Sequence, residues 1–86
     1  MISKELEFRG IHKNQLKLYF EELGAKTDGN RFNGENWSGE IVSEKELEFT
    51  PAFKVNAVII RFYARNETEL EELIQQYRKK TTRIGG

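Results

Sequence analysis

The sequence has no cysteine, one proline and one histidine among its 86 residues. Without cysteine the chain forms neither disulfides nor thiolate metal sites, and it offers no cysteine nucleophile. The single histidine, His12, has no serine or cysteine partner in a catalytic motif, so we expect a loop residue and not a catalyst. The absence of cysteine also fits a reducing compartment, and we expect a cytoplasmic protein.

An excess of charge of one sign is also lacking, because fourteen basic side chains balance fourteen acidic ones. A neutral domain gives no electrostatic reason to expect nucleic acid or an anionic membrane as its partner. No apolar run approaches the roughly 18 residues of a membrane-spanning helix, and charged residues occupy the N-terminal stretch that would be apolar in a signal peptide. We therefore predict no DNA partner and no membrane partner.

Motifs for metal or nucleotide chemistry are missing as well. The glutamates show no dense spacing of the kind found in calcium-binding loops, so we interpret them as solvated side chains. Four glycines recur at intervals of five residues but lack the lysine and serine of a phosphate-binding loop: Gly24, Gly29, Gly34 and Gly39. We predict no metal site, no cofactor and no enzymatic activity.

The longest apolar-rich stretch is KVNAVIIRFYAR, residues 54–65. Because side chains alternate between the two sides of a strand, one face of this stretch is wholly apolar after Asn56 and is predicted to carry the core. The other face ends with a tyrosine flanked by two arginines: Arg61, Tyr63 and Arg65. We predict a long, central, antiparallel strand against which the helices pack.

Periodicity places the other elements around this strand. Apolar stripes predict helices over about residues 14–23, capped by Asn14, and over residues 66–80, capped by Asn66. Alternation predicts further strands near residues 2–8, 30–32, 36–42 and 46–49. The order β-α-β-β-β-β-α favours an α+β fold of two layers, with an antiparallel sheet and both helices on one face. We expect one domain over residues 1–80 and a flexible C-terminal tail over residues 81–86.

The uncovered face of such a sheet is the predicted binding surface, because exposed apolar sheet faces mark a protein partner or a second subunit. We expect the contact surface to comprise Trp37, Arg61, Tyr63 and Arg65. For the arginines a structural alternative, cross-strand pairing with the glutamates at 44, 46 and 48, is favoured over RNA binding. For Trp37, anchoring a hairpin on the core is favoured over an interface contact.

The chain ends in Gly85-Gly86, which resembles the ends of ubiquitin-like sulfur carriers, including the small subunit of molybdopterin synthase. The resemblance implies a carboxylate that an enzyme activates after the slender tail has entered its channel. Those carriers have a β-grasp fold with a tail that follows a strand, whereas this sequence predicts a helix before the glycines. An ordinary chain end is therefore the favoured interpretation.

The element order, the KVNAVIIRFYAR stretch and the ending KKTTRIGG resemble a small uncharacterised bacterial family, similar to the C-terminal domain of MoaD-related proteins of molybdopterin biosynthesis. The resemblance implies a TATA-binding-protein-like architecture without DNA binding, since topology does not transmit function. It implies a role accessory to cofactor biosynthesis. From the uncovered sheet face and the missing catalytic motifs we expect a non-enzymatic binding or adaptor module, with a protein partner or homo-oligomer at the sheet face. The alternatives are a covalent carrier activated at Gly86 and a small-ligand or RNA binder on the sheet.

Overall fold

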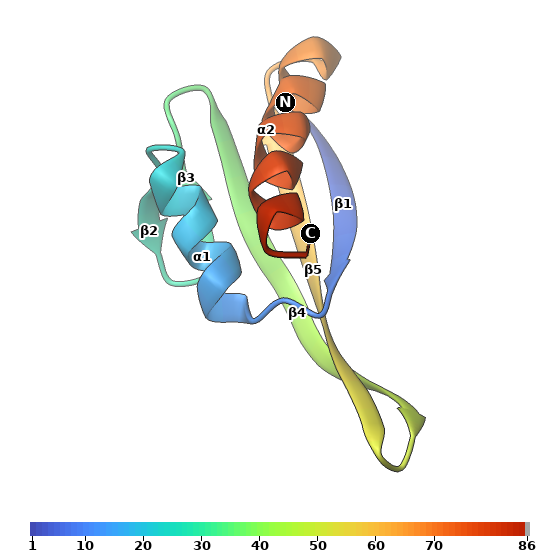
Figure 1. Ribbon diagram of the computed structural model, residues 1–86. Helices are drawn as coiled ribbons and strands as arrows, with labels where there is room; N and C mark the ends of the chain where they lie inside the picture. The colour runs from blue at the N-terminus through green and yellow to red at the C-terminus, as the bar shows by residue number, and fades with distance from the viewer. Residues whose placement is uncertain (86) are drawn as a thin grey trace.

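The structure, a computed structural model, describes residues 1–85 and the side chains of residues 1–82. It contains one five-stranded sheet and two helices (Figure 1). The elements are β1 Ile2–Arg9, α1 Lys13–Glu22, β2 Lys26–Asp28, β3 Arg31–Asn33, β4 Trp37–Thr50, β5 Phe53–Ala64 and α2 Glu67–Gly85. Neighbouring strands are antiparallel in the order β1-β5-β4-β3-β2, which confirms the predicted α+β fold.

Strand β5 is central because it pairs with β1 on one side and with β4 on the other. Its alternation follows the predicted pattern, with Val58, Ile60 and Phe62 fully buried on one face. Arg61 and Tyr63 on the other face are partly exposed. The core therefore lies on one side of the sheet, and the opposite side, which we call the open face, carries Arg61 and Tyr63.

Both helices lie on the core side of the sheet (Figure 1). Helix α1 contributes Phe20, whose ring stacks on that of Phe32 with centroids 4.7 Å apart. Helix α2 contributes Tyr77, whose ring centroid lies 5.2 Å from that of Phe62. Gly39 on β4 leaves room for this packing, because a Cβ atom there would lie 2.5 Å from the ring of Phe20. A side chain at this position would push α1 away from the sheet.

The two helices begin differently. The prediction for α2 is confirmed, because the Asn66 side chain accepts a hydrogen bond of 2.9 Å from the backbone N–H of Glu69. The predicted cap of α1 at Asn14 is wrong: the cap position is His12, and Asn14 already lies in the first turn. Gly24 follows α1 with a φ of 94°, a left-handed conformation that favours glycine at the end of a helix.

Helix α2 is longer than the sequence predicted. We expected a flexible tail over residues 81–86; α2 runs to Gly85, so residues 81–85 are helical. The hydroxyl of Thr82 donates a hydrogen bond of 2.8 Å to the carbonyl of Arg78, so a polar side chain is accommodated within the helix. Gly86, the residue predicted to carry an activated carboxylate, lies outside the described residues.

Strand β4 is one long strand where the sequence predicted two. We expected strands near residues 36–42 and 46–49 with a turn between them, but β4 continues from Trp37 to Thr50. A β-bulge between Ile41 and Ser43 interrupts the alternation of apolar and polar residues without ending the strand. In the sequence this interruption looked like the end of a strand.

Strand β2 was not predicted, because its three residues are all exposed and carry no apolar alternation. It pairs with β3 through a turn after Asp28, where Gly29 has a φ of 64° that suits glycine. This hairpin supplies the outermost strand on one side of the sheet.

The β4–β5 hairpin continues beyond the rest of the sheet. Strand β1 pairs with β5 only as far as Ala57, and the pairs between residues 46 and 56 join β4 and β5 alone. We call residues 46–56 the arm; Figure 1 shows it projecting away from both helices. The molecule is accordingly elongated, with extents of 43 × 25 × 21 Å. Pro51 lies in the turn at the tip, where its missing backbone N–H removes no hydrogen bond from the sheet.

Candidate functional site

The open face carries one row of alternating charges that crosses all five strands. The register places Asp28 opposite Arg31, Arg31 opposite Glu40, Glu40 opposite Arg61, and Arg61 opposite Glu5. The signs alternate from one strand to the next, and opposite charges on facing residues stabilise a sheet. We call these five residues the charge row.

Arg61 is held in the middle of this row by its neighbours. Its guanidinium donates from Nε to Glu5 at 2.8 Å, and Nη2 forms an ion pair with the same carboxylate. Nη1 donates to the hydroxyl of Tyr63 at 3.4 Å, and that hydroxyl donates to Glu40 at 3.3 Å. The hydrogen bonds to Tyr63 and to Glu5 raise the pKa of Arg61 further above its usual value, so the cation is permanent.

Tyr63 therefore lies at the centre of a network of charged groups. The guanidinium of Arg31 lies 5.6 Å from the centroid of its ring, a distance at which a cation is attracted to an aromatic face. An RNA-binding sheet stacks bases on exposed aromatic rings, whereas Arg31 already occupies this one. Tyr63 thus differs from the open aromatic rings of RNA-binding sheets, because a cation of the same chain lies over it.

Arg65 does not belong to this network. It follows the end of β5 and bonds to Glu69 on α2, with Nε–Oε2 and Nη2–Oε1 distances of 3.0 and 2.5 Å. The hydrogen bonds raise the pKa of Arg65 and lower the pKa of Glu69. The pair links the start of α2 to the end of β5. The hydrogen bonds of the Arg65 side chain therefore go to α2, and not to the residues that bond to Arg61 and Tyr63.

Trp37 lies on the core side of the sheet, so the expectation that it would lie on the uncovered face is wrong. Its register partner is Ala64, which is buried, and its ring lies 6.0 Å from that of Phe20. A Cβ atom at Gly34 would overlap the indole, which explains the glycine at that position. The half-buried indole anchors the β3–β4 turn on the core, as the favoured interpretation of the sequence had it.

The predicted cross-strand pairing is right in kind for Arg61, wrong for Arg65, and wrong in the partners of both. We expected the glutamates at 44, 46 and 48, but the carboxylates are Glu5 on β1 and Glu69 on α2. No pattern within one strand determines its register with a neighbour, so Glu5 on β1 could not be placed beside Arg61 from the sequence. Of the three expected glutamates, Glu46 instead forms an ion pair with Lys54 at 3.8 Å.

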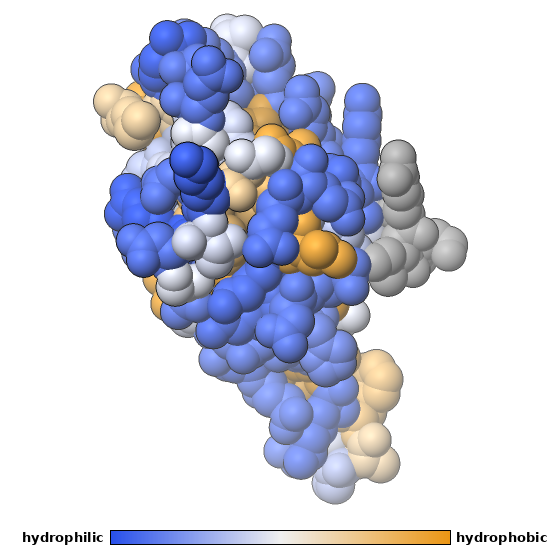
Figure 2. Space-filling model, turned by 90° about the vertical axis from the view of Figure 1, so that its left-hand side faces the viewer, coloured by the Kyte–Doolittle hydropathy of each residue, from blue (hydrophilic) through white to orange (hydrophobic). Residues whose placement is uncertain are grey.

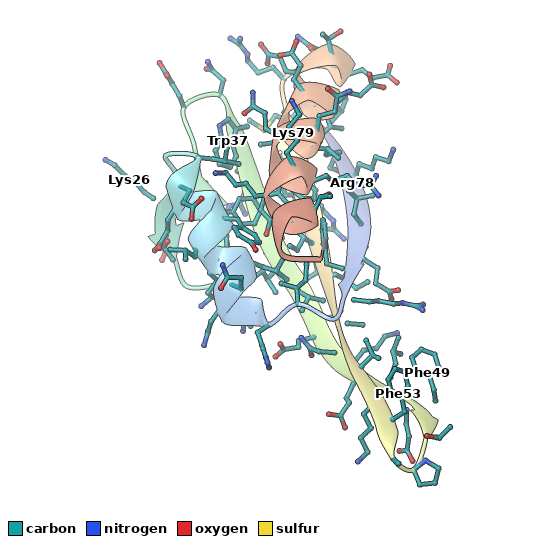
Figure 3. The ribbon with its side chains drawn as sticks, viewed as in Figure 1. Lys26, Trp37, Phe49, Phe53, Arg78 and Lys79 are labelled. Atoms are coloured by element: carbon teal, nitrogen blue, oxygen red, sulfur yellow. The ribbon has the colours of Figure 1, made fainter. Side chains whose placement is uncertain are left out.

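The arm has an apolar side that the sequence analysis missed. Leu47 pairs directly with Val55, and nearer the tip the rings of Phe49 and Phe53 lie 5.7 Å apart. The two phenylalanines are 54% and 57% exposed, and they project from the same side of the arm (Figure 3). We call these four residues the apolar strip. In the sequence, the alternation of Leu47 and Phe49 close to Pro51 indicated a strand. It did not indicate that this strand extends beyond the other strands of the sheet.

The concave parts of the surface offer no comparable constellation. A groove of about 400 Å³ lies between the end of β1 and the last turns of α2, with Phe8, Arg9 and Arg78 among its lining residues. His12 is exposed beside α1. Within residues 1–82, no three side chains of the metal-ligating types come together. None of the described helices is both long enough and apolar enough to span a bilayer.

Fold and surface together define a class: a small α+β protein whose antiparallel sheet has two helices on one face and a patterned row of charges on the other. The model of the family described as archaeal MoaD-like protein matches residues 4–86, so the chain belongs to that family. A search of curated proteins found no match. The expected relation to MoaD is thus confirmed for the family, whereas the match shows neither a bacterial family nor a correspondence to a C-terminal domain.

Proposed function

We propose that the protein is a non-enzymatic binding module that holds a protein partner on the open face of its sheet. Membership of the MoaD-like family supports a role accessory to the biosynthesis of the molybdopterin cofactor. The observation that carries the binding role is the charge row with Tyr63 at its centre, on the face opposite to the helices.

Fixed charges suit the recognition of a protein better than mobile ones. Arg61 is bonded to Glu5 and Tyr63 before any partner arrives, so its side chain loses little conformational entropy on binding. Alternating charges select a partner with the complementary pattern and oppose partners that place like charges opposite them. Tyr63 adds a ring and a hydroxyl, which together serve apolar and polar contacts.

The test is capture of partners from an extract of the native host by immobilised protein. Arg61→Glu places a third carboxylate between Glu5 and Glu40 and reverses the centre of the charge row, so the partner should be lost. The matched control is Lys79→Glu, the same change of charge on the exposed side of α2 (Figure 3). Thermal melts of both variants check the fold. Retention of every captured protein by Arg61→Glu would count against the proposal.

A second candidate function is a covalent carrier activated at Gly86. It is favoured by the family match, which extends to residue 86 and so includes Gly85-Gly86. Intact mass of the protein from its native host, followed by sequencing of the C-terminal peptide, would reveal an oxygen-to-sulfur exchange at Gly86. Full activity of a variant without Gly85-Gly86 in a complementation assay would remove this candidate and leave the binding module.

A further inference from the structure

The apolar strip is a second surface, separate from the charge row, and it lies where no third strand covers the arm. Figure 2 shows hydrophobic surface at the free end of the arm, below a mostly hydrophilic body. Exposed aromatic side chains that lie side by side are typical of the centre of protein interfaces. We propose that two copies of the chain associate through their arms, strip against strip, about a two-fold axis.

The register of the arm fits such an axis. If the two-fold axis passes through the Leu47–Val55 pair, this pair of one copy packs against the same pair of the other copy. The next residue of β5 on the same side toward the sheet is Ala57, and the next toward the tip is Phe53. Because both lie two residues from Val55, the rotation brings Phe53 of one copy over the position of Ala57 of the other. The methyl group of Ala57 is itself fully buried, so the ring would meet the side chains that cover it.

The charges around Ala57 complement the rings. Ala57 pairs with Lys45 on β4 and with Arg9 on β1, so two cations flank the place where the phenylalanine rings arrive. Cations are attracted to the faces of aromatic rings, and the long stems of lysine and arginine cover apolar surface. Arg9 is also bonded to Glu7 at 2.6 Å, which holds its guanidinium beside this place. Each copy thus offers both the rings and the cations, as a two-fold interface requires.

A membrane is a poorer occupant for the strip than a second copy. The opposite side of the arm bears Glu46 and Glu48, and the register continues that side with Glu44. Against these three carboxylates the hairpin has two lysines, at 45 and 54. The hairpin therefore carries no excess of positive charge and the chain as a whole is neutral, so no long-range attraction draws the arm to an anionic lipid surface.

The oligomeric state of the full chain in solution tests the proposal by sedimentation equilibrium. The wild type should sediment at about twice the monomer mass of 10.1 kDa and dissociate on dilution. Phe49→Ser with Phe53→Ser should give a monomer at the same concentrations. The matched control changes a facing pair on the other side of the arm, Glu48→Ser with Lys54→Ser, and should remain a dimer. A monomeric wild type at every concentration, or a dimeric Phe49→Ser/Phe53→Ser variant, would overturn the proposal.

A cross-link keeps the test decisive if the serine variant loses the structure of its arm. The chain contains no cysteine, so one introduced thiol is unique. With a short bis-maleimide reagent, Leu47→Cys at the axis should form a covalent dimer, and Glu46→Cys on the reverse side should not. Equal cross-linking of the two variants would refute the strip-to-strip arrangement. The dimer proposal is independent of the proposed function. If the protein were a monomer but Arg61→Glu still abolished capture of the partner, the dimer would be refuted and the binding role on the open face would stand.

Discussion

Tyr77 and Tyr19 are buried side by side, but only Tyr77 has a partner for its hydroxyl. The Tyr77 hydroxyl donates to the carbonyl of Leu16 at 2.8 Å and so ties α2 to α1. The Tyr19 hydroxyl is buried without a hydrogen-bond partner among the described residues, although its ring lies 6.0 Å from that of Tyr77. A hydroxyl that is buried without a partner costs stability, whereas one with a partner contributes to it.

The two tyrosines therefore make a matched pair of variants. Tyr77→Phe should lower the free energy of unfolding by about 1 kcal/mol, because it removes a buried hydrogen bond. Tyr19→Phe should leave the stability unchanged or raise it, because it removes a buried hydroxyl that makes no such bond. Urea unfolding of both variants measures the difference. Equal losses in the two would show that the Tyr77 hydroxyl does not link the helices.

Burial raises the pKa of Tyr77 well above its usual value, with a smaller contribution from Tyr19. The folded state therefore keeps the Tyr77 proton at a pH where the unfolded chain, with a tyrosine pKa of about 10, releases it. The associated stability is complete below that pH and is lost as the pH rises above it. The stability of the wild type should accordingly fall more steeply above about pH 10 than that of Tyr77→Phe.

At the scale of elements, the contact between α1 and β4 depends on Gly39. A methyl group at this position would meet the buried ring of Phe20, and the helix would have to shift to admit it. Gly39→Ala should therefore destabilise the protein by about 1–3 kcal/mol, the usual cost of overpacking a core. Ser43→Ala, on an exposed part of the same strand, should change little. Equal urea midpoints for the two variants would contradict this account of the packing.

The sequence was sufficient for the elements that carry a long apolar pattern. The alternation of β5 and the stripe of α2 are both recovered, since burial on one side repeats with the period of the element. Strand β4 was predicted as two strands, because a β-bulge and the end of a strand both interrupt the alternation of apolar and polar residues. Strand β2 was missed because nothing in it is buried, and α2 was cut short because two threonines resemble a chain end.

The candidate site was predicted less well than the fold, for a reason of register. Arg61 and Tyr63 were placed on the open face, because alternation within one strand assigns its faces. Glu5, Arg31 and Glu40 were not assigned to it, since cross-strand neighbours depend on register, which no pattern within one strand determines. Trp37 was placed on the wrong side in the expected surface, because its polar neighbours hid the turn that anchors it on Phe20.

At the scale of the whole molecule, the protein has a body and an arm with different surfaces. The body presents the charge row, where opposite charges face one another across the strands. The arm presents the apolar strip, which the proposed dimer would bury while leaving Tyr63 accessible. If both proposals hold, one dimer would bind two partners at once, one on each open face.

The most direct test of the binding role is the chemical modification of Tyr63 with and without its captured partner. Tyr19 and Tyr77 are 4% and 0% exposed and serve as internal references, whereas Tyr63 is partly exposed at the centre of the charge row. Nitration followed by peptide mass spectrometry should modify Tyr63 in the protein alone and should protect it in the complex. If Tyr63 were nitrated equally fast in both, the partner would bind elsewhere and the open face would not be the binding surface.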